Sequence, residues 1–220
     1  MTHIQFDEKR EIEKRRELWQ AIIEGYLQPL ISSGPRGRLL DVGSGWGEFI
    51  NCVKSPQKFA IDHDLAFARF VSPEVAFSVQ DVRSLAFPDR FFDVVFVSNV
   101  LEHLPARDDV LRALVDFHRV LKPGGWLIIL QPNFKYCFRN YFDFFDHYCA
   151  YTEASMVEGL RLAKFSSFER VIARFLPFST KSRLPQWAWL VRLYLRLPIA
   201  WRVFGQQFLI VAIKEAGVES

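Results

Sequence analysis

"LLDVGSGWGEF", residues Leu39 to Phe49, is the stretch that decides the fold of this 220-residue chain. A pattern typical of a buried strand leads into three glycines at alternate positions, Gly43, Gly45 and Gly47, and a helical pattern follows at once. Glycine lets the backbone turn sharply and approach a ligand closely, and the first N–H groups of a helix are available as donors. The stretch therefore predicts a ligand-binding turn between a strand and a helix.

The nearest competing interpretation of this turn is a dinucleotide-binding site, whose fingerprint is GxGxxG. The position of its third glycine is occupied here by Glu48. A carboxylate is unfavourable where a pyrophosphate would lie, because both groups are negative. The sequence therefore disfavours NAD.

Acidic residues follow the next two predicted strands. "KFAID" ends at Asp62, from which a carboxylate can accept hydrogen bonds from both hydroxyls of an adenosine ribose. "VQDV" places Asp81 where it can accept from an adenine amino group while Val82 packs on the ring. Taken singly, Asp62 could equally cap the helix that begins near Asp64, and Asp81 could be an ordinary turn residue. "FDVVFVSNVLEHL" and "HRVLKPGGWLIIL" follow in order, and the ordered series is much more specific than any member.

Short apolar strands alternate with helical patterns from Arg38 onward, which is typical of a mostly parallel sheet with helices on both faces. The last two predicted strands lack an ordinary helical crossover and suit an antiparallel pair at one edge. A charged amphipathic helix over Asp7 to about Leu27 precedes them and is expected to end near Pro29. The predicted strands are "RLLDV", "KFAID", "VAFSVQ", "FFDVVFVS", "WLIILQ", a stretch around "VIARFLPF", and "QFLIVAI", and the other predicted helices are about Glu48 to Val53, Leu65 to Val71, Ala106 to Leu121 and Thr152 to Lys164.

Residues 38 to 131 resemble the cofactor half of class I S-adenosylmethionine-dependent methyltransferases, in the broad subgroup with an "LxxGxGxG" loop and an "EHL" after the fourth strand. The resemblance implies an α/β, Rossmann-like sheet of seven strands in the order 3-2-1-4-5-7-6, with the seventh antiparallel. It also implies S-adenosyl-L-methionine as the cofactor, with its methionine part in the glycine loop and its sulfonium beside Ser98 and Asn99. The cofactor-binding residues it implies are Asp41, Gly43, Ser44, Gly45, Gly47, Asp62, Asp81, Val82, Ser98 and Asn99.

The chain is interpreted as a single methyltransferase domain covering residues 1–220. An N-terminal helix lies in residues 1–30, and the cofactor-binding half covers 38–131. The acceptor half covers 132–220 and contains an insertion at 179–205.

Two histidines are candidates for a base at the acceptor. Methyl transfer draws most of its acceleration from proximity and alignment, and a base is needed only if the acceptor is a hydroxyl or a protonated amine. His103 lies near the mouth where α/β sheets bind ligands, although the histidine of "EHL" often only helps to close the pocket. His147 lies beside Asp146 in "YFDFFDHYCAYT", and an Asp–His pair suits a proton acceptor, although a capping and packing loop explains it equally well. No metal site is evident, and a set of Asp143, Asp146 and His147 stays open as an alternative.

"QWAWLVRLYLRLPIAW", residues 186–201, lies in the predicted insertion between the last two strands. The region from Arg170 to Gln207 holds seven Lys or Arg and no Asp or Glu. Tryptophan and tyrosine beside arginine suit contact with a bilayer surface through residues 186–204, and a lid packed on the domain's own edge is the alternative. If the segment is helical from Gln186 to Leu197, one face carries Trp187, Leu190, Val191, Tyr194 and Leu195.

Composition limits the other function classes. No run approaches the roughly 20 uncharged apolar residues of a spanning helix. The charged N-terminus lacks a secretory signal, so we expect a cytoplasmic protein, with peripheral attachment to the membrane face as an option. We expect the thiols of Cys52, Cys137 and Cys149 to be buried and reduced. The C-terminal arginines are embedded in leucine-rich sequence, so no nucleic-acid partner is expected.

A narrower resemblance concerns the acceptor. "QPN…Y", "DFFDH" and "RFLPF…LP…GQQFLIVA" are similar to bacterial methyltransferases of polysaccharide or glycolipid assembly. This resemblance implies O-methylation of a saccharide or lipid-linked glycan. The alternatives are a quinone- or polyketide-like metabolite and, outside enzymes, a cofactor-binding scaffold at the membrane surface.

Overall fold

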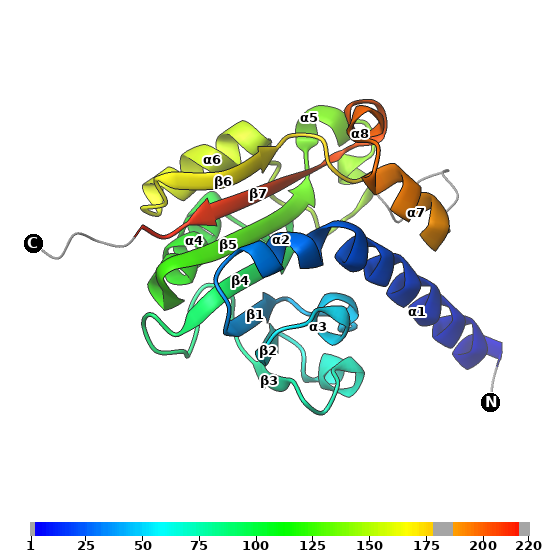
Figure 1. Ribbon diagram of the computed structural model, residues 1–220, viewed down its shortest axis with the longest axis horizontal. Helices are drawn as coiled ribbons and strands as arrows, with labels where there is room; N and C mark the ends of the chain where they lie inside the picture. The colour runs from blue at the N-terminus through cyan, green and yellow to red at the C-terminus, as the bar shows by residue number, and fades with distance from the viewer. Residues whose placement is uncertain (1–2, 178–186, 216–220) are drawn as a thin grey trace, which may run out of the picture.

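Seven strands form one sheet in the computed structural model, which describes residues 3–177 and 187–215 (Figure 1). Every strand contains β-branched or aromatic residues, which favour extended backbone. The strands are β1 (Arg38–Val42), β2 (Gln57–Asp62), β3 (Ala76–Val79), β4 (Phe92–Ser98), β5 (Leu121–Pro132), β6 (Ser167–Ile172) and β7 (Gln207–Ile213).

The sheet order is β3-β2-β1-β4-β5-β7-β6, which confirms the predicted topology. The strands from β3 to β5 pair in parallel, whereas β7 runs antiparallel to both β5 and β6. The order reverses direction at β1, because the chain leaves β1 toward β2 and returns to β4 on its other side. Ligands of open α/β sheets bind at such a switch point, beyond the carboxyl ends of the strands.

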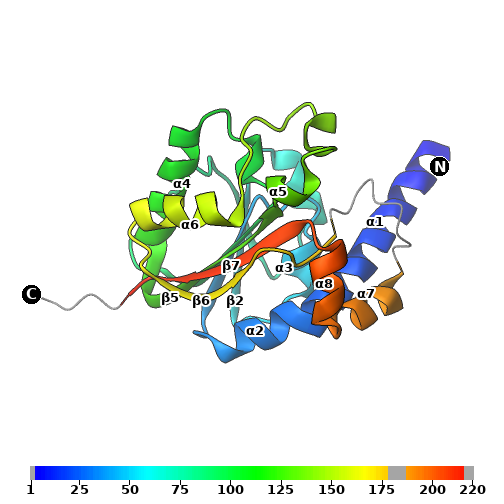
Figure 2. The same ribbon diagram turned by 90° about the horizontal axis from the view of Figure 1, so that it is seen from above.

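Helices cover both faces of the sheet, as predicted (Figure 2). Side chains alternate between the faces along each strand. Leu40 and Val42 of β1 therefore pack with α4 and α6, and Leu39 packs on the opposite side with α1, α2, α3 and α7. The helices are α1 (His3–Ile22), α2 (Gln28–Ser33), α3 (Glu48–Cys52), α4 (Arg107–Val120), α5 (Phe134–Cys137), α6 (Glu153–Leu162), α7 (Ala188–Leu195) and α8 (Pro198–Phe204).

The N-terminal helical region continues past Pro29, where the sequence predicted its end. A wider π-helical segment at Ile23–Leu27 connects α1 directly to α2. Pro29 lies in the first turn of α2, where its missing N–H removes no required hydrogen bond. The π-helical segment therefore allows the chain to accommodate Pro29, and helical structure extends to Ser33.

Strand β6 lies earlier in the chain than the predicted stretch around "VIARFLPF". It ends at Ile172, and Phe175 and Leu176 are buried in the loop that follows. The Phe175 N–H donates to the Gln207 carbonyl, and the Leu176 carbonyl accepts from Gln206 and Gln207. Phe175 and Leu176 belong to the core but not to a strand, and this explains why the strand was predicted too late in the chain.

The insertion forms two helices, α7 within the predicted span from Gln186 to Leu197 and α8 directly after it. Residues 178–186 lie outside the described part of the chain. Helix α7 packs on α1 and the π-helical segment, with Leu195 buried against Gly25 and Arg192 3.1 Å from Glu24. Trp187 is 57% exposed and precedes the helix, which begins only at Ala188, so it is not part of the predicted helical face.

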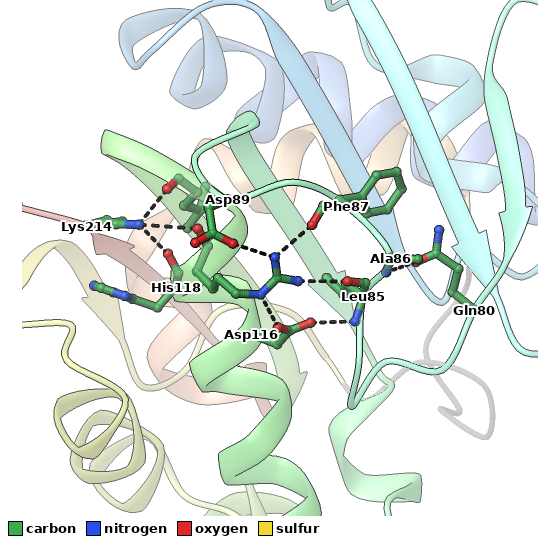
Figure 3. A network of polar contacts seen from close by, with 10 residues as sticks. Gln80, Leu85, Ala86, Phe87, Asp89, Asp116, His118 and Lys214 are labelled. Atoms are coloured by element: carbon green, nitrogen blue, oxygen red, sulfur yellow. Dashed lines mark hydrogen bonds and ion pairs between the residues drawn. The ribbon is translucent and has the colours of Figure 1, made fainter.

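A network of polar contacts that includes Leu85, Phe87, Asp89 and Asp116 holds the connection between β3 and β4 in place (Figure 3), and Arg119, near the end of α4, is its central residue. Its guanidinium donates to the carbonyls of Leu85 and Phe87, both at 2.7 Å, and contacts Asp89 and Asp116 at 2.8 and 2.6 Å. Charge-assisted bonds to several partners are stronger than neutral ones. This network fixes the segment that follows Asp81 and so supports one wall of the candidate site.

His118, beside Arg119, is expected to make the fold sensitive to acid. Burial, with Lys214 and Lys164 nearby, lowers the pKa of His118 from 6.5 to about 4. Between these values the unfolded chain binds a proton that the folded chain does not, so the free energy of unfolding falls as the pH drops through this window. Urea denaturation between about pH 7 and about pH 4.5 should show a steeper loss for the wild type than for His118→Gln. Parallel pH profiles for the two proteins would contradict this assignment.

No described helix has both the length and the apolar character that crossing a bilayer demands. The thiols of Cys52, Cys137 and Cys149 are all free, and those of Cys137 and Cys149 are buried as predicted, whereas Cys52 is only partly covered.

Candidate functional site

The glycine loop after β1 adopts a backbone that only glycine accommodates without strain. Gly43, Gly45 and Gly47 all have positive φ, at 69°, 51° and 71°. A Cβ on Gly43 would lie 2.4 Å from a methyl carbon of Val100, whereas one on Gly45 would meet nothing within 4 Å. The Gly43 and Ser44 N–H groups donate to the Ile61 carbonyl at the end of β2. The loop is therefore anchored on one side and open at Gly45.

Three buried carboxylates surround this loop. Asp41, Glu48 and Asp62 are 3%, 9% and 5% exposed. Burial, together with the nearby Glu48 and Asp62, raises the pKa of Asp41 well above its usual range. Uncompensated negative charge in a buried site is unfavourable. The acidic surroundings of the loop therefore favour a ligand that brings positive charge and disfavour a pyrophosphate.

Asp62 connects the loop to β2. One of its carboxylate oxygens accepts the Gly45 N–H at 2.9 Å, and the other accepts the His63 N–H at 2.8 Å. A carboxylate offers about four acceptor positions, so capacity remains for a further donor. Asp62 also borders the opening at Gly45.

Helix α1 closes the outer side of the loop, a contribution that sequence reasoning missed. Arg15 donates to Glu48 at 2.7 Å, and its guanidinium lies 4.8 Å from the centre of the Trp46 ring. Trp19 packs edge-on against Phe49, with ring centroids 6.2 Å apart. No local pattern indicates contacts over more than 30 residues, although the charged amphipathic helix itself was visible.

The predicted adenine contacts lie after β3. The Asp81 carboxylate accepts from the Arg83 backbone and side chain, and Arg83 lowers the pKa of Asp81. Any ligand donor to Asp81 therefore shares the carboxylate with Arg83. Val82 is partly buried against the core.

Ser98 and Asn99 follow β4 at the same edge of the sheet. Asn99 has a φ of 52°, a conformation that asparagine tolerates better than most residues. Its backbone N–H donates to the Leu130 carbonyl of β5. The chain therefore turns sharply here, toward the helical turn Leu101–His103.

A second polar cluster lies just beyond that turn, where the segment between β5 and α6 folds over it. His103 Nδ1 lies 3.0 Å from the Asp146 carbonyl oxygen and 3.1 Å from its carboxylate. The rings of His103 and His147 are 5.1 Å apart between centroids. The structure therefore brings together the three residues that the sequence singled out for the acceptor end.

Glu102 is the member of this cluster that sequence reasoning passed over. It is 1% exposed, and its carbonyl accepts the Tyr148 and Cys149 N–H groups. Burial raises the pKa of Glu102 to about 8, and the Asp146 carboxylate adds to the rise. The signal that could have found Glu102 was the "EHL" motif, in which it precedes His103.

The ligand atoms of Glu102, His103 and His147 lie within 4.8 Å of one another. This is the only such triplet of acidic, histidine or cysteine residues in the described part of the chain, so the set of Asp143, Asp146 and His147 does not gather there. Asp143 is instead exposed on the surface of the loop.

Comparison with known proteins shows which proteins the chain resembles. Residues 40–129 match a family described as a methyltransferase domain. Over 111 residues the chain is 30% identical to a protein of Ectopseudomonas mendocina named "Ubiquinone/menaquinone biosynthesis C-methyltransferase UbiE". The alignment covers 44% of this chain and 42% of that protein, so the chain spans less than half of that relative.

Solved structures resemble the chain over most of its length. A S-adenosylmethionine-dependent methyltransferase from Thermotoga maritima has a TM-score of 0.67 at 18% identity, and 95% of each chain is covered. One from Archaeoglobus fulgidus has a TM-score of 0.64 at 19% identity, with 90% of this chain and 94% of that chain covered. The chain therefore has the Rossmann-like fold of these methyltransferases, and residues 40–129 match a methyltransferase domain.

Proposed function

We propose that the protein is a S-adenosylmethionine-dependent methyltransferase that acts on a small, amphipathic acceptor. The observation that carries the proposal is the buried trio of Asp41, Glu48 and Asp62 around a glycine loop at the switch point of the sheet. S-adenosylmethionine has a positive sulfonium and a positive ammonium group, which the trio complements. The open position at Gly45 leaves room for close approach to the backbone.

Each cofactor-binding residue has a proposed role. Asp41, Gly43, Ser44, Gly45 and Gly47 form the wall beside the methionine part. Beyond it, Asp62 holds the ribose hydroxyls, Asp81 and Val82 contact the adenine, and Ser98 with Asn99 positions the chain near the reacting sulfur.

At the acceptor end, the residues of the chain orient the acceptor and manage its proton. The bound cofactor supplies an electrophilic methyl group. The protein holds the acceptor in line with that group, which supplies most of the acceleration. His147, with His103 and Asp146 beside it, is placed to take the proton of a hydroxyl acceptor.

The acceptor class favoured by the relatives is a quinone-like metabolite. The matched protein of Ectopseudomonas mendocina is named for ubiquinone and menaquinone biosynthesis. The name of this relative gives no support to the saccharide or glycan acceptor expected from the narrower resemblance. Exposed aromatic residues on the loop after β5, with Phe145 98% and Phe142 60% exposed, suit an acceptor that has an apolar part.

A labelled methyl-transfer assay tests the proposal. Purified protein is incubated with S-adenosylmethionine carrying a labelled methyl group, together with a bacterial lipid extract, a saccharide extract or hydroxylated quinone precursors. We expect label in the lipid or quinone fraction. Label only in saccharides would show that the acceptor is a saccharide and not a quinone-like metabolite. Cofactor binding without any labelled product would support the non-catalytic scaffold instead.

The insertion is proposed to contact a membrane surface from which an amphipathic acceptor is drawn. Trp187 and Trp189 stack on each other and are each more than half exposed, as are Ile199 and Val203. Basic side chains lie among them, and no acidic residue occurs from Arg170 to Gln207. Aromatic rings and arginines together favour the interface of an anionic bilayer.

Reversing two of these charges should release the protein from vesicles. Arg196 and Arg202 are exposed, and each basic residue near an anionic surface contributes about 1 kcal/mol. We expect Arg196→Glu/Arg202→Glu to bind vesicles of anionic lipid at least about tenfold more weakly in flotation. The matched control is Arg112→Glu/Arg161→Glu, on α4 and α6 at the opposite face of the sheet. A wild-type protein that never floats, or equal losses in both variants, would contradict the contact.

A further inference from the structure

We propose that Glu102, His103 and His147 form a binding site for a divalent transition-metal ion, with Zn²⁺ as the best-fitting ion. The two histidines and the glutamate come from two separate segments, the helical turn after β4 and the loop before α6. One potential ligand atom from each residue lies within 4.8 Å of the others. Atoms that share one tetrahedral Zn²⁺ lie about 3.4 Å apart, so binding requires the side chains to move together by about 1 Å.

Backbone hydrogen bonds hold the two segments of the site together. The Glu102 carbonyl accepts the Tyr148 N–H at 2.9 Å and the Cys149 N–H at 3.2 Å. The buried Tyr141 hydroxyl donates to the Cys149 carbonyl, which fastens the start of the loop to its end. These hydrogen bonds hold the loop that carries His147 in place beside the turn that carries Glu102 and His103.

The contacts of His103 select the tautomer that a metal requires. Its Nδ1 faces the Asp146 carbonyl oxygen at 3.0 Å and an Asp146 carboxylate oxygen at 3.1 Å. Both oxygens only accept hydrogen bonds, so Nδ1 carries the proton and Nε2 keeps its lone pair. Metal-binding histidines usually donate their second N–H to a carboxylate or a carbonyl in this way.

The buried carboxylate of Glu102 gives an independent indication of a cation. Glu102 is 1% exposed, and its Oε2 is buried without a hydrogen-bond partner in the described part of the chain. A buried polar group without a partner is costly, and native proteins usually satisfy such groups with a protein atom, a water or an ion. A cation held with His103 and His147 would satisfy this oxygen.

The ligand set decides which ion fits. Two imidazoles and one carboxylate match the three protein ligands of many catalytic zinc sites, whereas Mg²⁺ and Ca²⁺ prefer oxygen ligands. Three protein ligands leave one position open, and His103, whose side chain is 37% exposed, lies at the solvent side of the cluster. A hydroxyl bound at that position would lose its proton more readily, because the cation stabilises the resulting oxyanion.

Metal binding can be tested without any methyl-transfer assay, so this inference and the proposed function can fail separately. Protein without an affinity tag is depleted of metal with a chelator and titrated with Co²⁺ and with Zn²⁺. We expect one ion per chain, with the visible absorption of Co²⁺ in an imidazole site and its loss when Zn²⁺ is added. His103→Ala and Glu102→Gln should each bind Co²⁺ at least about tenfold more weakly, and Asp146→Asn about tenfold more weakly.

Matched controls make the result specific. His63→Gln removes an exposed histidine elsewhere, and Asp143→Ala removes an exposed carboxylate from the same loop as His147. Both should bind Co²⁺ like the wild type, and circular dichroism confirms that every variant is folded. Absence of stoichiometric binding to the folded wild type, or equal binding by the wild type, His103→Ala and Glu102→Gln, would overturn the proposal. Loss of binding in Asp143→Ala alone would move the site onto the loop and also overturn it.

Discussion

Replacing Asp62 with alanine is expected to weaken binding of S-adenosylmethionine by about 100-fold or more. The Asp62 carboxylate ends β2, is 5% exposed, and is proposed to accept hydrogen bonds from two ribose hydroxyls. A hydrogen bond to a charged group contributes about 1.5–3 kcal/mol, so the loss of two costs about 3 kcal/mol or more. Each 1.4 kcal/mol corresponds to about a tenfold change in the dissociation constant. Isothermal titration calorimetry measures that constant directly.

The same substitution also loosens the glycine loop, which should add to the loss. The Asp62 carboxylate accepts the Gly45 N–H at 2.9 Å and so holds the loop against β2. Asp62→Asn keeps one acceptor oxygen and should therefore lose less affinity than Asp62→Ala. The two variants together separate the charge of Asp62 from its role as an acceptor.

Asp64→Ala is the matched control for Asp62. Asp64 lies two residues further along and is exposed, and its carboxylate caps the helical turn that follows by accepting the Ala66 N–H. Its removal should lower stability slightly and leave the dissociation constant unchanged. If Asp62→Ala bound the cofactor as tightly as the wild type, the proposed ribose contact would be wrong, and with it the placement of the cofactor.

The fold was predictable where local pattern and core packing agree. The short apolar stretch "RLLDV", buried from Leu39 to Val42, and the continuous apolar run of "QFLIVAI" each mark one strand, and both strands form where predicted. The prediction was wrong where an apolar run is buried for another reason. Phe175 and Leu176 follow β6 and fill the core from a loop, which the pattern alone does not distinguish from a strand.

The candidate site was predictable in its acidic and glycine positions, because each follows a strand at the same edge of the sheet. The structure places Asp41, Asp62 and the glycine loop together as expected. Glu102 was not predicted to be a site residue, because an acidic residue in a short turn is usually exposed to solvent. Only the later loop, which brings His147 over the turn, buries it.

The negative charges around the glycine loop favour a cationic ligand. Arg15 compensates Glu48 from α1, and the Asp62 carboxylate accepts the Gly45 N–H at the open position of the loop. A cationic ligand gains from this field, whereas a pyrophosphate would be repelled. Glu48, which alone disfavours NAD in the sequence, therefore belongs in the structure to an acidic site that favours a cationic cofactor.

Replacing His147 with alanine is expected to lower the turnover number by about 100-fold to 10,000-fold, the range for loss of a group that manages a proton in the transition state. The affinity for S-adenosylmethionine should be unchanged, because His147 lies on the loop before α6 and not beside the glycine loop. Turnover is measured with the labelled methyl assay, and affinity by calorimetry. Asp143→Ala, on the same loop but exposed, should retain wild-type turnover. Unchanged turnover in His147→Ala would exclude the ring from the reaction.

Metal depletion separates two roles of the His147 ring, direct acceptance of the proton and ligation of a cation. The site formed by Glu102, His103 and His147 predicts that turnover of the wild type falls when metal is removed and returns when Zn²⁺ is added. This result is expected because a bound cation, and not the free imidazole, then stabilises the acceptor oxyanion. Cofactor affinity should stay constant throughout, since the acidic trio and the glycine loop contribute nothing to the metal site. Full turnover in the metal-depleted wild type, together with its loss in His147→Ala, would instead assign the proton to the imidazole itself.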